Sequence, residues 1–275
     1  MTAPPYVRYE LRESGVGILT LDNPPLNLTT LTTLDRLMTA CRQIAGDESV
    51  RVLVVTGAGD KAFCAGSDIG EFDSVREDVV THKLARENEA FLAIEELPMP
   101  VIAALNGATL GGGGEIALAC DIRIMDETAR IGFPEVKLGV FPGSGGVFRL
   151  ARIIGPASAY ELLYTGDVID GPAAYRIGLV NRLAAKGRCL SAALALAETL
   201  AKRPALSLSL IRAGVRDSFS QTTREAIKRT LADSHRVFTG PDIDEGVSAF
   251  FAKRPAAFTA GRSAKRGSNK KGSVE

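Results

Sequence analysis

A carboxylate beside a run of glycines is the strongest chemical signal in the sequence. Residues 111–114 are all glycine, and Glu115 follows them at the start of an apolar pattern that ends at Cys120. Glycine lets backbone amides approach a ligand closely, and the first N–H groups of a helix lack internal partners. Such amides can stabilise a developing oxyanion. Burial on an apolar helix would raise the pKa of Glu115 and suit it to general acid–base chemistry.

A second carboxylate, Glu135, follows Gly132-Phe133-Pro134. On its own it is typical of a solvated loop acid. The glycine run alone favours close helix–sheet packing and ligand binding equally, because both need glycine. Taken together, two carboxylates and a glycine-rich helix start make a coherent constellation for proton transfer beside an oxyanion site.

Other chemical signals are weaker. Gly57, Gly59 and Ala62 fit a relaxed dinucleotide fingerprint, but no helix pattern opens at the third position, so we interpret the segment as a surface turn. Neither His82 nor His235 has a plausible partnership with a Ser and an Asp in the sequence, which argues against a Ser-His-Asp triad.

The elements that must position these residues alternate between strands and helices. Two strands with a turn at residues 13–15 predict an N-terminal hairpin, and short β-branched runs predict strands buried on both faces. Alternating elements of this kind indicate an α/β fold. The expected strands are Val7–Leu11, Val16–Leu21, Val50–Val55, Val101–Leu105 and Ile122–Met125, and the expected helices include Leu31–Ile44, a charged helix at Val79–Glu96 and an apolar one at Glu115–Cys120.

Helical patterns dominate from about residue 156, and no strand pattern follows residue 183. We therefore predict a β/α core over residues 1–200 and a helical C-terminal region over residues 201–260. Residues 261–275 are basic and poor in apolar side chains, a composition typical of a disordered tail.

The composition excludes several classes of protein. The 275 residues are 45% hydrophobic and 24% charged, which is ordinary for a globular protein with a sizeable core. A net charge of +1 and the absence of Trp argue against a nucleic-acid partner. The four cysteines are widely spaced and form no metal-binding pair. With no signal-like start and no long apolar stretch, we expect no membrane association and a cytoplasmic protein; a mitochondrial matrix location stays open if a presequence was removed.

Three segments, in order, resemble signatures of the crotonase, or enoyl-CoA hydratase/isomerase, superfamily. They are Lys61–Ile69, Asn106–Ile122 and Gly132–Gly146, and the likeness runs from about residue 16 to residue 258. The resemblance implies a spiral of ββα units with a helical C-terminal trimerisation region. It also implies a trimer or a dimer of trimers, an acyl-CoA thioester substrate as in fatty acid β-oxidation, and no cofactor beyond the coenzyme A of the substrate.

By position, the resemblance assigns roles to individual residues. The backbone N–H groups of Ser67 and Gly112 would hold the thioester oxygen, and Glu115 and Glu135 fall on the catalytic glutamates of the two-glutamate enoyl-CoA hydratases. Water would add to a trans-2-enoyl-CoA to give a 3-hydroxyacyl-CoA. Residues expected to line the substrate or its coenzyme A are Ala62, Phe63, Ala65, Gly66, Asp68, Ile69, Gly111, Pro134, Gly143 and Lys253.

Several alternatives stay open. Enoyl-CoA double-bond isomerisation is the nearest rival, because an isomerase can work with one acid/base group. A silent CoA-binding scaffold and a nucleic-acid-binding protein are candidates from other classes. Val147-Phe148 and Asn27-Leu28 depart from the common pattern of the hydratases, and Phe72–Glu95 lies where the family shapes its acyl pocket. The sequence therefore leaves the acyl group undefined.

Overall fold

The protein is described by a computed structural model over residues 6–263. It divides into two compact units, Met1–Glu198 and Thr199–Glu275. The first unit holds all the strands and, as predicted, is an α/β fold with parallel sheets. Within residues 6–263 no helix is long and apolar enough to cross a membrane.

The main sheet of the first unit is built around strands that are buried on both faces. Every residue of β3 (Val52–Gly57) and β5 (Val101–Leu105) is buried, as their β-branched and small side chains predict for central parallel strands. The strand order is β1-β2-β3-β5-β7-β10, with β1 and β2 antiparallel and the other neighbours parallel. The remaining strands of this sheet are β1 (Tyr6–Leu11), β2 (Val16–Asp22), β7 (Ile122–Asp126) and β10 (Arg182–Ala184).

A second sheet brings three distant loops to one edge. Its order is β4-β6-β8-β9, and β4, β6 and β8 are parallel to one another. Because carboxyl ends of parallel strands meet at the same edge, the segments after these strands lie close together. Those segments contain Ser67, Gly112 and Glu135 in turn. The strands are β4 (Ala62–Cys64), β6 (Ala108–Leu110), β8 (Arg130–Gly132) and β9 (Val168–Asp170), each too short to show in the sequence pattern.

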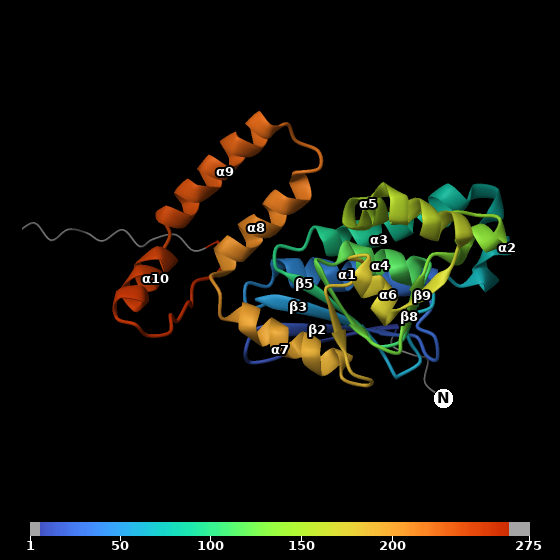
Figure 1. The fold of residues 1–275 in the computed structure, drawn as a ribbon, viewed down its shortest axis with the longest axis horizontal. Coiled ribbons are helices and arrows are strands. Elements are labelled where there is room, and N and C mark those ends of the chain that lie inside the picture. The colour runs from blue at the N-terminus through green and yellow to red at the C-terminus, as the bar shows by residue number, and fades with distance from the viewer. Residues whose placement is uncertain (1–5, 264–275) are drawn as a thin grey trace, which may run out of the picture. The chain divides into compact units, whose positions relative to one another are not determined.

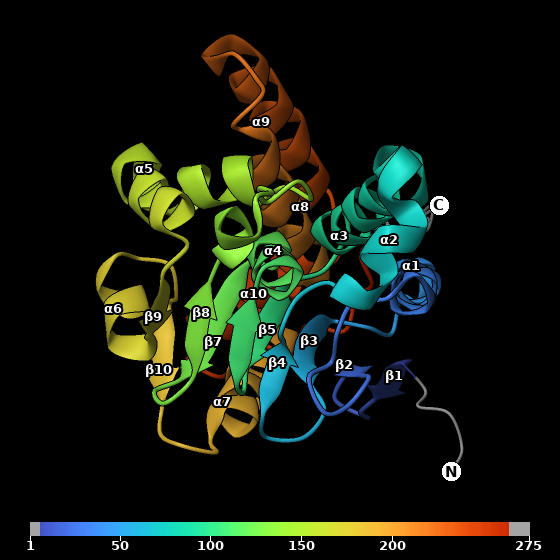
Figure 2. The ribbon, with the colours of Figure 1, turned by 90° about the vertical axis from the view of Figure 1, so that its right-hand side faces the viewer.

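A row of helices packs from α1 through α3 and α4 to α5, above β3 and β5 in Figure 1 and along the top of the strands in Figure 2. The row encloses most of the hydrophobic core, with Leu34, Phe91 and Ile116 fully buried. The helices are α1 (Leu31–Gly46), α3 (Ala85–Glu95), α4 (Gly112–Ala119) and α5 (Gly146–Thr165).

Short turns and helices connect these elements. The region 69–84 is a succession of one-turn pieces, η1 (Ile69–Glu71), α2 (Phe72–Val75), η2 (Arg76–Asp78) and the π-helical η3 (Val80–Leu84). The later ones are the 3₁₀ helix η4 (Pro134–Leu138) and the α-helices α6 (Gly171–Arg176) and α7 (Cys189–Ala201).

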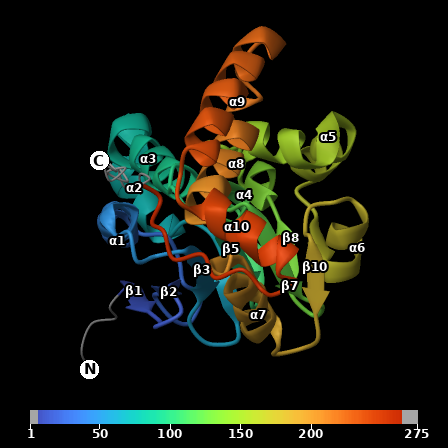
Figure 3. The same ribbon diagram turned by 90° about the vertical axis from the view of Figure 1, so that its left-hand side faces the viewer.

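The second unit is helical over its described residues. Thr222 begins α9 with a capping box, in which its side chain accepts from the Glu225 N–H and the Glu225 carboxylate accepts from the Thr222 N–H. Both α8 and α10 pack on α9. Figure 3 shows α9 leading into α10. Their bounds are α8 (Ala205–Asp217), α9 (Thr223–Phe238) and α10 (Asp242–Phe251), the last of which the sequence pattern did not reveal.

Two predicted helix boundaries are wrong in an informative way. The helix expected from Glu115 begins at Gly112, so the glycines form its first turn rather than a loop before it. The helix expected over Val79–Glu96 is interrupted: a π-turn occupies residues 80–84 before α3 begins. The predicted disordered tail lies outside the described residues from residue 264 onward.

Candidate active site

Glu115 lies in the first turn of α4 and is 2% exposed. Its Oε1 accepts hydrogen bonds from the backbone N–H groups of Ser144 (2.9 Å) and Gly146 (2.8 Å). The pKa of Glu115 is raised to about 8; burial is the largest cause, the nearby carboxylates of Glu135 and Glu87 act in the same direction, and the two N–H donors act against them. A carboxyl that titrates near neutral pH can both accept and return a proton.

Glu135 is held on η4, directly after Pro134. Its Oε2 is buried and is the one such side-chain oxygen or nitrogen in residues 6–263 without a hydrogen-bond partner. Burial raises the pKa of Glu135, and the charge of Glu87 acts in the same direction. An acid with an unpartnered oxygen and a raised pKa favours its protonated form.

Gly111 lies against the Glu135 carboxylate, and Gly112 lies near the predicted oxyanion amide of Ser67. A Cβ on Gly111 would lie 3.1 Å from Glu135 Oε1, and the φ of +50° at Gly111 itself favours glycine. A Cβ on Gly112 would lie 3.7 Å from the Ser67 nitrogen and 3.4 Å from Ser67 Oγ. The carboxylate of Glu135 and the Ser67 amide therefore approach α4 at successive residues of its first turn.

The two amides predicted to bind an oxyanion are available to a ligand. The parallel bridge between Thr29 and Ser67 uses the N–H groups of Thr29 and Asp68, not that of Ser67. Gly112 is the first residue of α4, where a helical N–H has no acceptor within the helix. Helix α4 also directs the positive end of its dipole toward this point.

The other two glycines of the run serve packing. A Cβ on Gly113 would lie 2.0 Å from the Cys64 carbonyl oxygen, and one on Gly114 would lie 2.7 Å from the ring of Phe133. Gly113 and Gly114 are therefore packing positions, while Gly111 and Gly112, beside the Glu135 carboxylate and the Ser67 amide, stay the predicted ligand-facing positions.

The structure places most of the predicted binding residues on the loops around this point. Asp68 caps η1 by accepting from the Gly70 N–H at 2.9 Å, and Ile69 is 57% exposed. The Gly143 carbonyl accepts from Asn88 Nδ2 at 3.1 Å. Ala62 and Phe63 are fully buried in β4, Ala65 and Gly66 follow that strand, and Pro134 begins η4. Lys253 is exposed just after α10, in the second unit.

Two buried charged residues near the site were not recognised in the sequence. Glu87 and Lys83 are 3% and 1% exposed, yet both lie in a stretch that has the composition of a solvated helix. Their signal was spacing: Lys83, Glu87, Phe91 and Ile94 recur at intervals of three and four on one helical face, and Phe91 and Ile94 are core residues. A charged residue that shares a helical face with core residues is expected to have a buried side chain.

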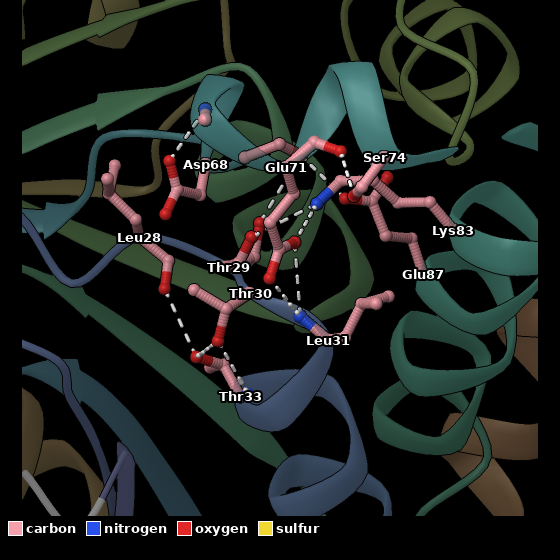
Figure 4. A network of polar contacts seen from close by, with 12 residues as sticks. Leu28, Thr29, Thr30, Leu31, Thr33, Asp68, Glu71, Ser74, Lys83 and Glu87 are labelled. Atoms are coloured by element: carbon pink, nitrogen blue, oxygen red, sulfur yellow. Dashed lines mark hydrogen bonds and ion pairs between the residues drawn. The ribbon is translucent and has the colours of Figure 1, made fainter. Parts of the chain in front are cut away.

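Lys83 and Glu71 join the short helices around the site. Lys83 Nζ donates to Glu71 Oε2 at 2.8 Å, and the Glu71 carboxylate also accepts from the Leu31 N–H at the start of α1. Figure 4 shows the ammonium of Lys83 directed at Glu71 between η1 and α1. Within residues 6–263 no cluster of His, Cys, Asp or Glu is arranged to hold a metal ion.

The comparisons with known proteins agree with this fold and geometry. Residues 11–261 match the enoyl-CoA hydratase/isomerase family. The chain is 36% identical over 249 residues to a crotonyl-CoA hydratase of Syntrophomonas wolfei, covering 90% of this chain and 95% of that one. It is 34% identical over 244 residues to a short-chain-enoyl-CoA hydratase of Clostridium acetobutylicum, covering 88% and 94%.

A solved structure of an enoyl-CoA hydratase from Bacillus anthracis superposes with a TM-score of 0.88 at 33% identity, covering 92% of this chain and 98% of that one. Family, relatives and fold thus agree over nearly the whole chain, and the predicted crotonase-like fold is confirmed. The chain is an enzyme of the enoyl-CoA hydratase/isomerase family, within the crotonase superfamily.

Proposed function

We propose that the enzyme is an enoyl-CoA hydratase that adds water reversibly to a trans-2-enoyl-CoA to give a 3-hydroxyacyl-CoA. The observation that carries the proposal is a pair of carboxylates, the buried Glu115 and the half-buried Glu135 with its buried Oε2, beside the unpaired amides of Ser67 and Gly112. The relatives named crotonyl-CoA and short-chain-enoyl-CoA hydratase support the same reaction.

Both carboxyls have raised pKa values, that of Glu115 about 8, so the ionised Glu115 that hydration needs becomes its main form only above about pH 8. The hydrogen bonds support one assignment of base and acid. Glu115 Oε1 accepts two backbone N–H groups, an arrangement that favours the ionised form. Glu135 Oε2 has no partner among the described residues, and this favours the acid. Glu115 is therefore the general base and Glu135 the general acid in the hydration direction.

Glu115 and Glu135 carry out the proton transfers of the hydration, and the Ser67 and Gly112 amides stabilise its intermediate. Glu115 takes a proton from water while the water oxygen bonds to C3, and the electron pair of the double bond moves through C2 to the thioester oxygen. The Ser67 and Gly112 amides stabilise that enolate oxygen, and loss of one such donor typically lowers a rate by about 10²–10³. Glu135 then delivers its proton to C2, and exchange with solvent restores both groups.

Two further parts of the proposal concern binding and assembly. Lys253, with its exposed cation, is the candidate contact for the coenzyme A phosphates.

Exposed apolar side chains on α9, among them Ile227 and Leu231, fit the predicted trimer or dimer of trimers. Light scattering at defined protein concentration measures the assembly; a monomer at all concentrations would contradict it. The cytoplasm stays the predicted compartment.

Loss of the conjugated enoyl-thioester absorbance of crotonyl-CoA tests the reaction. We expect turnover by the wild type and losses of at least about 10²-fold in Glu115→Ala and in Glu135→Ala, within the range of general acid–base contributions. The matched control is Glu96→Gln, an exposed glutamate at the end of α3, which should retain wild-type turnover. Turnover that survives both substitutions would contradict the assignment of the site.

Enoyl-CoA isomerisation is the second candidate, because an unpartnered acid such as Glu135 can shuttle a proton by itself. A 3-enoyl-CoA substrate separates the two reactions. An isomerase would convert it to the conjugated 2-enoyl thioester without needing Glu115, so Glu115→Ala would remain active.

A further inference from the structure

A third buried carboxylate, Glu87 of α3, joins two loops of the site. Ser67 Oγ donates to Glu87 Oε1 and Ser144 Oγ donates to Glu87 Oε2, each at 2.6 Å. The two serines come from different places in the chain: Ser67 follows β4, and Ser144 precedes α5. Hydroxyl–carboxylate bonds of this length are charge-assisted and directional.

Each of the two serines carries a functional backbone amide. The Ser67 N–H is one of the two proposed oxyanion donors, and the Ser144 N–H donates to Glu115 Oε1 at 2.9 Å. The single side chain of Glu87 therefore holds both serines: Ser67, whose amide would stabilise the enolate oxygen, and Ser144, whose amide orients the proposed base Glu115.

We propose that Glu87 is a positioning residue that sets the oxyanion amide of Ser67 and the carboxylate of Glu115 at a fixed mutual geometry. This inference rests on the proposed hydratase reaction. Glu87 reaches the reaction only through Ser67 and Ser144, so its loss should affect the transition state more than substrate binding.

The surroundings of Glu87 distinguish this role from simple packing. A buried carboxylate is unfavourable unless it is paired or hydrogen-bonded. The nearby cation does not pair with it in the described structure, because Lys83 Nζ donates to Glu71 at 2.8 Å and approaches the Thr29 carbonyl at 3.5 Å. The two serine hydroxyls satisfy its two carboxylate oxygens instead, so Glu87 bridges two loops and does more than fill space.

Helix α3 holds the second loop at further points. Asn88 Nδ2 donates to the Gly143 carbonyl at 3.1 Å. Glu95 pairs with Arg149 at 2.6 Å, and Arg149 Nη1 donates to the Ser144 carbonyl at 3.1 Å. Residues from successive turns of one helix thus fix the loop that carries the Ser144 amide, and Glu87 extends this support to Ser67.

The charged groups around Glu87 define its electrostatic effect. Glu115 on α4 and Glu135 on η4 both feel its negative charge, which raises the pKa of each. Cys64 on β4 has its pKa raised to about 12 by burial and stays a neutral thiol. Among the cations of this region, Lys83 is paired with Glu71, Arg149 with Glu95 and the exposed Arg86 with Asp35. Removal of the Glu87 charge should therefore lower the pKa of both catalytic glutamates.

Steady-state kinetics on crotonyl-CoA with three variants tests the proposal. We expect Glu87→Ala to lower kcat by about 10- to 100-fold, below the loss of a complete oxyanion donor, with KM changed less than threefold. Glu87→Gln keeps the shape and should recover at least about tenfold in kcat while shifting the pH–rate profile to lower pH. The matched control is Glu89→Gln, the exposed neighbour on the same helix.

A mutant cycle tests the coupling and also covers the case in which Glu87→Ala does not fold. Ser67→Ala and Ser144→Ala each remove one hydroxyl from the Glu87 carboxylate. We expect the loss in the double variant to be at least about tenfold smaller than the product of the single losses, because residues of one network are not additive. Additive losses, or a kcat within twofold of wild type in Glu87→Ala, would overturn the proposal.

The carbonyl stretching frequency of bound butyryl-CoA separates failure of this inference from failure of the proposed reaction. Butyryl-CoA has the thioester but no double bond, so the measurement needs no turnover. Polarisation by the Ser67 and Gly112 amides should lower the frequency in the wild type and lower it less in Glu87→Ala. If the wild type polarises the carbonyl but does not hydrate crotonyl-CoA, only the reaction is wrong. If Glu87→Ala polarises it as the wild type does, the positioning role is wrong.

Discussion

Ser144 donates its backbone N–H to Glu115 Oε1 at 2.9 Å while its side chain faces a different carboxylate. The carboxylate proposed as the general base is therefore oriented by a loop as well as by the helix that carries it. Gly146 donates to the same Glu115 oxygen at 2.8 Å. Two amides on one oxygen stabilise the ionised form of a group whose burial opposes ionisation, and the protonation state of Glu115 depends on this loop.

The raised pKa of Glu115 predicts a pH dependence of stability. The pKa of about 8 in the folded protein exceeds the ordinary glutamate value of 4.5. The folded state therefore binds the proton more tightly, and this contribution to stability is complete below the unfolded pKa and lost as the pH rises through the folded pKa. We expect the free energy of unfolding to fall between about pH 5 and about pH 8, and Glu115→Gln to flatten that fall. Urea denaturation at several pH values measures both; a parallel slope in the variant would contradict the prediction.

The substitution Gly111→Ala should displace the carboxylate of Glu135 and lower kcat more than it lowers the stability of the fold. Its Cβ would lie 3.1 Å from Glu135 Oε1, at a φ of +50° that is strained for alanine. We expect a loss in kcat of about 10² or more, the scale of a general acid. Gly59→Ala is the matched control, since φ is +76° there but nothing lies within 4 Å of the added carbon. If kcat fell equally in both variants, backbone strain alone would explain the effect of Gly111→Ala.

The neighbouring glycines should separate function from stability. In Gly112→Ala the added carbon meets only side-chain oxygens at 3.4 Å, near the Ser67 amide. We expect a melting temperature close to wild type and impaired turnover. In Gly113→Ala the carbon would lie 2.0 Å from a backbone carbonyl of β4, so the protein should be strongly destabilised. Thermal melts and crotonyl-CoA kinetics on both variants check this contrast; the reverse pattern would refute it.

The ion pair between the buried Lys83 and Glu71 should contribute to the stability of the fold. Lys83→Met leaves the Glu71 carboxylate without its cation and should lower the free energy of unfolding by about 1–3 kcal/mol, less than for a fully buried pair because the Glu71 side chain is 24% exposed. The double variant Lys83→Met/Glu71→Gln should recover part of the loss.

Chemical denaturation measures the effect of Lys83→Met. The control is Arg76→Met in the exposed pair with Asp73, where we expect a change of under about 1 kcal/mol. A loss in the double variant as large as in Lys83→Met would show that the effect does not come from the unpaired carboxylate.

The sequence predicted the central strands because each is a continuous apolar run, and the first helix because its apolar residues recur at intervals of three and four. Residues 52–57 and 101–105 are buried strands, as their β-branched runs indicate. Helix α1 begins after Thr30, whose side chain accepts from the Thr33 N–H. The second sheet could not be predicted, because strands of three residues show no period.

The candidate site was predictable only in part. Glu115 and the glycine run were recognised because their residue types are unusual together in an apolar segment. Glu87 was not, since its charged neighbours on α3 resemble a solvated face and its partners, Ser67 and Ser144, are distant in the chain. Its one sequence signal was the helical spacing that it shares with the core residues Phe91 and Ile94, and the three-dimensional arrangement shows that it faces inward.

Nuclear magnetic resonance of the product that the wild-type enzyme forms from crotonyl-CoA in ²H₂O tests the proposed hydration. Hydration through Glu115 and Glu135 predicts 3-hydroxybutyryl-CoA with oxygen at C3 and a single solvent deuterium at C2, since Glu135 exchanges its proton with solvent before delivering it. Recovery of unhydrated crotonyl-CoA from well-folded enzyme, or of a 3-enoyl thioester without a hydroxyl group, would contradict the account.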